Sequence, residues 1–166
     1  LVIYGGMEMV MVGIACVAFC FLYTTTLSYL GLGDVLVLMF FGIVPVCCTY
    51  YVCMPAPIQM PTGEILAAAI ACGLVVDTLL VLNNYRDIDN DRANGKMTLV
   101  VRIGERNAKW FYQHLGFAGI VIMGFTCGKD LWEVHSVMPI WLIFLGYGLL
   151  HAQTYKTMFR IRKGCE

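Results

Sequence analysis

The sequence predicts an all-α fold, a polytopic transmembrane helix bundle with about five membrane-spanning helices. Of the 166 residues, 60% are hydrophobic and only 13% are charged, and the mean hydropathy is +0.76. This balance lies outside the usual range of a soluble domain. Lipid offers no hydrogen-bond partners to an open backbone, so the spans should be helices. We therefore expect the lipid bilayer as a partner, and no nucleic acid.

Five apolar stretches approach the roughly 20 residues that a helix needs to cross a hydrocarbon core of about 30 Å. They are residues 9–29, 35–54, 64–84, 107–127 and 137–155. Only one long polar segment, residues 83–106, interrupts them, so we expect a single transmembrane domain over residues 1–166. The chain begins at Leu1 and ends at "RIRKGCE" without a closing element. We therefore expect it to be part of a longer chain.

The basic residues are distributed unevenly, and this distribution predicts the topology. All lysines and arginines except Lys129 lie in residues 86–109 or 156–163. By the positive-inside rule, both segments face the cytoplasm. The link 55–63 carries no charge and falls on the opposite side, as five spans require. The sequence therefore predicts that residues 83–106 form a cytoplasmic loop.

The stretch "NNYRDIDNDRANGK", residues 83–96, places several aspartates at the end of an apolar span. If the third helix continues to residue 91, at about 100° per residue, Asn84, Asp87 and Asp91 share one face. Asp77 lies two turns deeper on the same stripe. Asp89 points away, and we expect it to be solvated or ion-paired. The spacing therefore selects Asn84, Asp87 and Asp91 as a constellation.

Such a group of acidic residues is unfavourable without a counterion. Carboxylates four residues apart repel by a few tenths of a kcal/mol, and anions at a helix C-terminus oppose its dipole by about 0.3–1 kcal/mol. A divalent cation removes both penalties, and Mg²⁺ suits hard oxygen ligands together with substrate phosphate oxygens. Arg86, Arg92 and Lys96 are suited to the phosphate itself.

Two other interpretations of this stretch are a solvated loop and an EF-hand. The charges of a solvated cytoplasmic loop would simply hold the topology. An EF-hand also begins with alternating aspartates, but here its sixth position would be Arg92 instead of glycine and its twelfth Thr98 instead of glutamate. The EF-hand is therefore excluded. The cysteines of the spans form no CxxC pair, and we interpret them as small hydrophobic residues.

The segment "NNYRDIDNDRANGKMTLVVRIG", residues 83–104, resembles the second aspartate-rich motif of the UbiA-type intramembrane prenyltransferases. The segment "YTTTLSYLGLGDVLVLMFFGIVPVCCTYYV", residues 23–52, is similar to the branch of that family that prenylates 1,4-dihydroxy-2-naphthoate in menaquinone biosynthesis. Family members have nine transmembrane helices around a central cavity, and two aspartate motifs. Only the second motif occurs here, so the resemblance implies that the missing helices of the parent chain are structural partners.

The resemblance implies transfer of a polyprenyl group from polyprenyl diphosphate to 1,4-dihydroxy-2-naphthoate, with decarboxylation, giving demethylmenaquinone. It implies Mg²⁺ as the cofactor and the bacterial inner membrane as the location. It also implies roles for seven residues, with the partial chain expected to be inactive alone. Asp87, Asp91 and Asn84 would hold the metal, Asp87, Asp91 and Lys96 would be catalytic, and Asn84, Arg86, Arg92, Lys96 and Arg102 would bind the diphosphate.

Two further polar residues and several other functions stay open. Asp77 lies inside a span, where an ionisable group costs at least ~2.5–3.5 kcal/mol, so it is a candidate to support the acceptor phenol or a proton relay. The alternative is a structural position, with its neighbour Thr78 packing against another helix. His114 is a candidate to act on the acceptor hydroxyl, or a polar group between helices. The acceptor could instead be 4-hydroxybenzoate, homogentisate, haem or a chlorin. A cation transport subunit and a catalytically silent membrane fragment are the alternatives outside this chemistry.

Overall fold

The computed structural model describes residues 2–55, 58–131 and 138–163, in which helices joined by turns occur and no strand does. Short π-helical segments, η1 and η2, continue or connect the α-helices of the first half. The elements are α1 (Val2–Leu22), η1 (Tyr23–Leu27), α2 (Gly33–Val37), η2 (Leu38–Ile43), α3 (Val44–Cys53), α4 (Gly63–Arg86), α5 (Ile88–Ala93), α6 (Leu99–Leu131) and α7 (Met138–Lys163).

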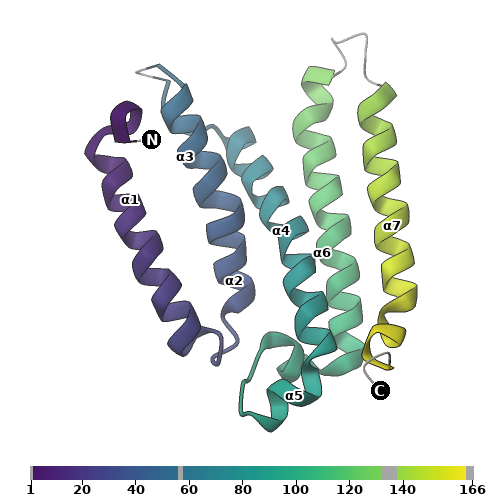
Figure 1. Ribbon diagram of the computed structural model, residues 1–166. Helices are drawn as coiled ribbons and strands as arrows, with labels where there is room; N and C mark the ends of the chain where they lie inside the picture. Colours follow the sequence, from purple (N-terminus) through teal and green to yellow (C-terminus); the bar gives the residue numbers. More distant parts are fainter. Residues whose placement is uncertain (1, 56–57, 132–137, 164–166) are drawn as a thin grey trace.

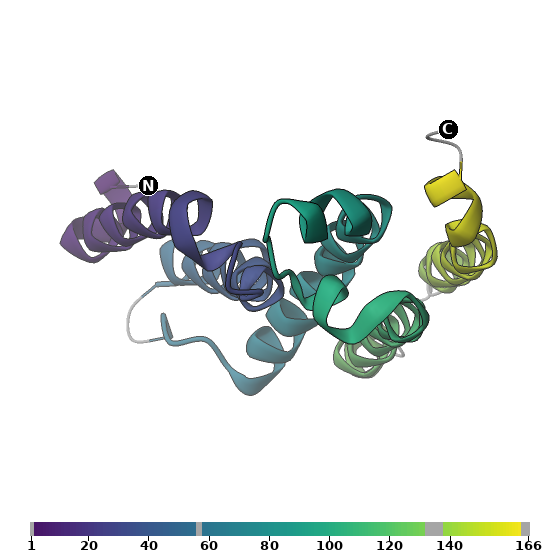
Figure 2. The same cartoon turned by 90° about the horizontal axis from the view of Figure 1, so that it is seen from below.

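The long helices run side by side, and the short helix α5 lies at one end of them (Figure 1). The turn between η1 and α2 lies at the same end as α5, and so does the start of α6. The end of α3 and the start of α4 lie at the opposite end. Figure 2 shows this arrangement along the helices, with the chain passing from α1 through α4 to α7. The polar segment after α4 is therefore gathered at one end of the bundle.

Three of the predicted spans correspond to helices that are both long and apolar enough to cross a membrane: Ile3–Leu22, Gly33–Cys53 and Gly63–Arg86. The predicted first span, 9–29, extends too far, because the helix changes to the π-helical segment η1 at Tyr23. Helices α6 and α7 contain 33 and 26 residues and are long enough as well, but over their described residues they are less apolar than these three. The all-α polytopic bundle is confirmed, and the chain is an integral membrane protein.

Helix α4 is held between two neighbours by contacts at glycine. A Cβ atom on Gly42 of η2 would lie 2.6 Å from the carbonyl oxygen of Ala69 and 2.7 Å from the Cα of Gly73, both in α4. A Cβ atom on Gly119 of α6 would lie 2.7 Å from Cγ2 of Val75. Small residues at helix contacts let membrane helices approach closely, which gains van der Waals packing without a hydrophobic driving force.

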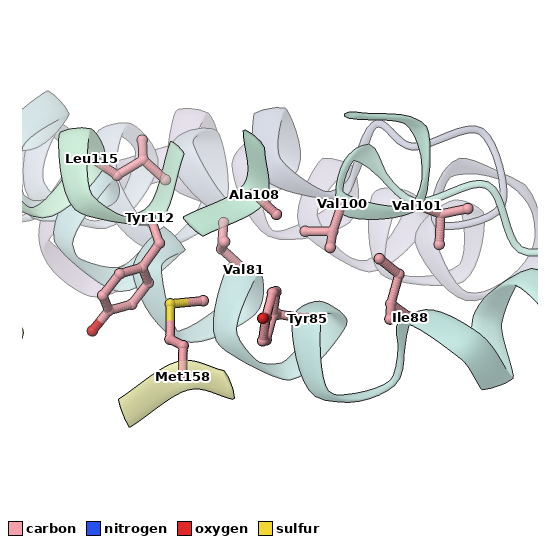
Figure 3. Close-up of a cluster of buried hydrophobic side chains, with 9 residues drawn as sticks. All are labelled: Val81, Tyr85, Ile88, Val100, Val101, Ala108, Tyr112, Leu115 and Met158. Atoms are coloured by element: carbon pink, nitrogen blue, oxygen red, sulfur yellow. The ribbon is translucent and has the colours of Figure 1, made fainter. Parts of the chain in front are cut away.

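A cluster of buried apolar side chains lies beneath the polar end, where α4, α5, α6 and α7 meet (Figure 3). Tyr85 and Val81 of α4 are fully buried there, and Ile88 of α5 is 2% exposed. The hydroxyl group of Tyr85 donates a hydrogen bond of 2.8 Å to Glu105 Oε1, so the ring is buried while its polar atom is satisfied. The members are Val81, Tyr85, Ile88, Val100, Val101, Ala108, Tyr112, Leu115 and Met158.

We predict that Gly42→Ala destabilises the protein by about 1–3 kcal/mol, the usual cost of overpacking, because the added methyl group would meet the α4 backbone. The measurement is the thermal midpoint of the detergent-solubilised protein. Gly124→Ala is the matched control, since nothing described lies within 4 Å of a Cβ atom at Gly124. Equal midpoints for the two variants would contradict the close contact between η2 and α4.

Candidate functional site

Two adjoining cavities lie where the apolar helices meet the polar end. The smaller has a volume of about 10 Å³, which is at the lower limit for one water molecule. It is lined by Tyr23, Ser28, Gly31, Gly33, Asp34, Leu80, Asn84, Lys96, Thr98 and Leu99. The larger has a volume of about 650 Å³ and is lined by Cys16, Phe19, Cys20, Tyr23, Leu36, Val37, Phe40, Phe41, Val76, Leu79, Leu80 and Asn83. Tyr23 and Leu80 line both, so the two cavities share part of a wall.

The helix that carries Asn84 does not continue to Asp91, so the expectation of one continuous helix is wrong. Helix α4 ends at Arg86, and Asp87 leaves the helical conformation with φ −95° and ψ 10°. The interruption turns α5 so that Ile88 enters the apolar cluster. Asn84 and Asp91 are still both buried, with 7% and 6% of their surfaces exposed.

Asp87 does not share the buried position of Asn84 and Asp91, because it pairs with its neighbour Arg86. The guanidinium of Arg86 donates two hydrogen bonds of 2.8 Å, from Nε to Oδ1 and from Nη2 to Oδ2 of Asp87. These bonds lower the pKa of Asp87, burial partly opposes them, and the charges of Arg86 and Lys96 lower the pKa further. Asp87 is therefore ionised at neutral pH.

The side chains of the Arg86–Asp87 pair are 46% and 42% exposed. A pair this exposed contributes at most about 1 kcal/mol to stability, because water screens it. Arg86 and Asp87, both predicted site residues, are therefore paired with each other, but the pair is weak enough to separate.

Asp91 and Lys96 are brought together by the turn that ends α5. Gly95 has φ +70°, and the backbone N–H of Lys96 donates to the carbonyl of Asp91 at 2.9 Å, the pattern of a Schellman C-cap. The chain folds back, and Lys96 Nζ lies 3.4 Å from Asp91 Oδ1. The other carboxylate oxygen, Asp91 Oδ2, is buried and has no hydrogen-bond partner in the part of the chain that the structure describes.

Asp34 belongs to the site although the spacing argument did not select it. It is 8% exposed, and neither carboxylate oxygen has a hydrogen-bond partner among the described residues. It lines the small cavity together with Asn84 and Lys96. The signal that could have found it is the position of an ionisable residue at the start of an apolar span, which marks a functional candidate in a membrane protein.

Arg102, predicted to contact diphosphate, joins two backbone segments at this end of the bundle. Its Nε donates to the carbonyl of Met97 at 3.1 Å, and its Nη2 donates to the carbonyl of Leu30 at 3.0 Å. The backbone N–H of Met97 donates to Tyr29 at 3.2 Å. Gly31, with φ +73°, allows this contact, since a Cβ atom there would lie 2.6 Å from the Met97 carbonyl.

The remaining candidates lie outside the linings of these two cavities. Arg92 and Asp89 are exposed on α5. Asp77 is 3% exposed within α4, and its Oδ1 has no hydrogen-bond partner among the described side chains and backbone. His114 is exposed, and its Nδ1 lies 2.7 Å from the Trp110 carbonyl on the same helix. One ring nitrogen of His114 therefore already has a hydrogen-bond partner within its own helix.

Within residues 2–55, 58–131 and 138–163, no group of three or more histidine, cysteine, aspartate or glutamate side chains is placed to hold a metal ion. The three side chains that the sequence predicts as metal ligands are therefore not all in one place. Asn84 and Asp91 are buried, and Asp87 is turned toward Arg86.

We predict that Arg102→Met increases amide hydrogen exchange in residues 29–34 and 95–98, because the fork that joins the two segments is lost. Arg106→Met, an exposed position on the same helix, is the control. Mass spectrometry of peptides from the membrane-embedded protein measures the exchange. Unchanged exchange in both segments would show that Arg102 does not hold them together.

Comparison with known proteins agrees with this arrangement of an acidic site at the end of apolar helices. The model of the UbiA prenyltransferase family matches residues 1–161. The chain is 39% identical over 131 residues to the 1,4-dihydroxy-2-naphthoate octaprenyltransferase of Escherichia coli. The aligned residues cover 79% of the chain and 40% of that protein. It is 36% identical over 122 residues to the enzyme of the same name from Mycobacterium leprae, covering 69% of the chain and 40% of that protein.

A third relative is the mouse UbiA prenyltransferase domain-containing protein 1, which is 30% identical over 131 residues, 78% of the chain and 37% of that protein. No solved structure matches the chain. The chain spans about 40% of the length of the curated bacterial relatives cited above. The match over residues 1–161 nevertheless includes both cavities and the whole acidic segment, and the chain belongs to the UbiA prenyltransferase family.

Proposed function

We propose that the protein transfers a polyprenyl group from polyprenyl diphosphate to 1,4-dihydroxy-2-naphthoate, with decarboxylation, giving demethylmenaquinone. The observation that carries the proposal is the apolar cavity of about 650 Å³, whose lining reaches Asn83, the first residue of the polar segment that carries the acidic and basic side chains. A polyprenyl diphosphate has the same two parts, an anionic head and an apolar tail. The names of the bacterial relatives support the naphthoate acceptor.

The apolar cavity would hold the prenyl tail. Side chains such as Phe19, Phe40 and Leu79 line it. Because the tail enters from the lipid, van der Waals contacts with these side chains would hold it. The bound tail also keeps water away from the allylic carbon, so that the aromatic ring is the nucleophile that reaches it. The cavity thus favours prenyl transfer over hydrolysis.

Basic side chains at the polar end would bind the diphosphate. When the bond between the allylic carbon and the diphosphate oxygen breaks, negative charge grows on the leaving group, and preplaced cations stabilise it. Lys96 pairs with Asp91 and its side chain is 31% exposed, so it can reach a diphosphate beside the small cavity and is the strongest candidate for this catalytic role. Arg92 is exposed on α5, while Arg86 pairs with Asp87 and Arg102 with backbone carbonyl groups.

The residues present fit a divalent cation of the Mg²⁺ type. Asp91 Oδ2 is a buried carboxylate oxygen without a hydrogen-bond partner in the described chain. Asn84 is buried and lines the small cavity together with Lys96, the partner of Asp91. Mg²⁺ commonly takes one or two carboxylates and completes its shell with water and substrate phosphates. Asp91 and Asn84 would therefore hold it, with Asp87 as a further ligand. When bound, it would neutralise charge on the departing diphosphate.

The polar segment, residues 83–106, would face the cytoplasm in a bacterial inner membrane. This assignment is supported by the position of all lysines and arginines except Lys129 in residues 86–109 or 156–163. Soluble substrates and Mg²⁺ would then reach the site directly, while the prenyl tail enters from the lipid.

A second candidate is the same reaction with another aromatic acceptor, such as 4-hydroxybenzoate, homogentisate, haem or a chlorin. It is favoured by the relatives whose name gives only the family and no acceptor, including the mouse protein. Prenylation assays with each acceptor in turn separate the candidates. Turnover of 4-hydroxybenzoate without turnover of the naphthoate would contradict the first proposal.

We predict that Asp91→Ala and Asp87→Ala in the full-length protein each lower prenyl transfer to 1,4-dihydroxy-2-naphthoate by at least about 100-fold, because they remove carboxylates that hold the metal-bound diphosphate. Product is measured by chromatography of membranes supplied with Mg²⁺ and polyprenyl diphosphate. Asp89→Ala is the matched control, since this carboxylate is exposed on α5. Near-normal turnover of both test variants would overturn the role assignment.

We also predict that residues 1–166 expressed alone give no prenylated naphthoate, whereas the full-length protein does. The chain spans about 40% of its bacterial relatives, and the first aspartate motif of the family does not occur in its sequence. The same membrane assay measures both proteins at matched abundance. Product from residues 1–166 alone would show that one aspartate motif is sufficient.

A further inference from the structure

The Asp34 carboxylate is buried at a cavity wall without any partner in the described chain. It is 8% exposed, and neither oxygen accepts a hydrogen bond from the described residues. Burying a carboxylate without hydrogen bonds is costly, and a ligand, a water molecule or an ion in the adjoining cavity can offset this cost. Asp34 therefore presents two strong acceptors to whatever enters the small cavity.

The size of the cavity limits what can enter. Its volume of about 10 Å³ admits about one oxygen-sized group. A diphosphate, with its two tetrahedral groups, is far too large, and a single hydroxyl group fits. A hydroxyl group is also a donor, which is what a carboxylate without a partner requires.

The position of the cavity favours a hydroxyl group that is attached to an aromatic ring. The small cavity shares Tyr23 and Leu80 with the apolar cavity. A ring whose hydroxyl group occupies the small cavity would lie at this junction, beside the head of a prenyl chain in the large cavity. Gly33, next to Asp34, lies close to Leu80, since a Cβ atom there would lie 3.4 Å from Leu80 Cδ2.

We propose that Asp34 binds a phenolic hydroxyl group of the aromatic acceptor and so orients its ring toward the allylic carbon. Asp34 accepts the hydrogen bond, and Asn84 and Lys96 complete the polar wall. The inference rests on the proposed function, because it names the acceptor subsite of the same reaction. The alternatives at this position are a structural water molecule and a divalent cation.

The test uses the full-length protein in membranes and two variants, Asp34→Ala and Asp34→Asn. Two monohydroxy analogues, 1-hydroxy-2-naphthoate and 4-hydroxy-2-naphthoate, serve as competitive inhibitors of naphthoate prenylation, so that binding is measured without their turnover. Each retains one of the two hydroxyl groups of the acceptor. Asp89→Ala is the control, and the KM for polyprenyl diphosphate and the Mg²⁺ dependence are measured in parallel.

We expect Asp34→Ala to raise the KM for the dihydroxynaphthoate by about 10-fold or more, the usual effect of losing a hydrogen bond to a charged group. Asp34→Asn should fall between Asp34→Ala and wild type, because the amide oxygen still accepts a hydrogen bond without the charge. The inhibition constant should rise for only one of the two analogues, the one that keeps the hydroxyl group bound by Asp34. The KM for polyprenyl diphosphate should change by less than about twofold, since that substrate lies outside the small cavity.

Several outcomes would overturn the inference. Equal inhibition constants in wild type and Asp34→Ala would assign the cavity to water, and an equal rise for both analogues would show a general distortion. A changed Mg²⁺ dependence or a raised KM for polyprenyl diphosphate would assign Asp34 to the cation or the diphosphate. If wild type prenylates no phenolic acceptor, the proposed function fails together with the inference. If wild type is active and Asp34→Ala resembles it, only the inference fails.

Discussion

The close packing of α4 against both of its neighbours is the constraint on which the site depends. Gly42 and Gly73 let η2 and α4 approach until their backbones are in contact, and Gly119 allows α6 to approach from the other side. Helices in lipid gain little from burying apolar surface against one another, so such contacts carry much of their association. Because α4 is fixed on two sides, its last turn holds Asn84 at the wall shared by α2 and the start of α6.

Local turns bring the segments of the polar end together. Gly95 closes α5 and returns Lys96 to Asp91, and Gly31 permits the 29–31 turn to touch Met97. Arg102 then joins the two segments through their carbonyl groups. Three parts of the chain that are distant in sequence, near residues 34, 84 and 96, line one cavity as a result.

The acidic segment shows where sequence reasoning succeeds and where it stops. Helical spacing places Asn84 and Asp91 together, and both are buried. Asp89 is exposed, as its position on the helix predicts. The same spacing misplaces Asp87, because it assumes a continuous helix. In the fold, burial of Ile88 in the apolar cluster accompanies the interruption at Asp87, and the carboxylate pairs with Arg86. The spacing of residues along one helix cannot predict that Ile88 will be buried against other helices or that the helix will end before it.

The sequence by itself determined that the protein is an α-helical membrane protein, because long apolar stretches in lipid can satisfy their backbone only as helices. Its acidic segment also pointed to the family and to the location of the polar end. Only the tertiary structure decided that Asp34 joins Asn84 and Lys96, that Arg102 connects two backbone segments, and that a small polar cavity adjoins a large apolar one. These features arise from contacts between residues far apart in the chain, and such contacts depend on the packing of α4 and not on the spacing of residues along any one helix.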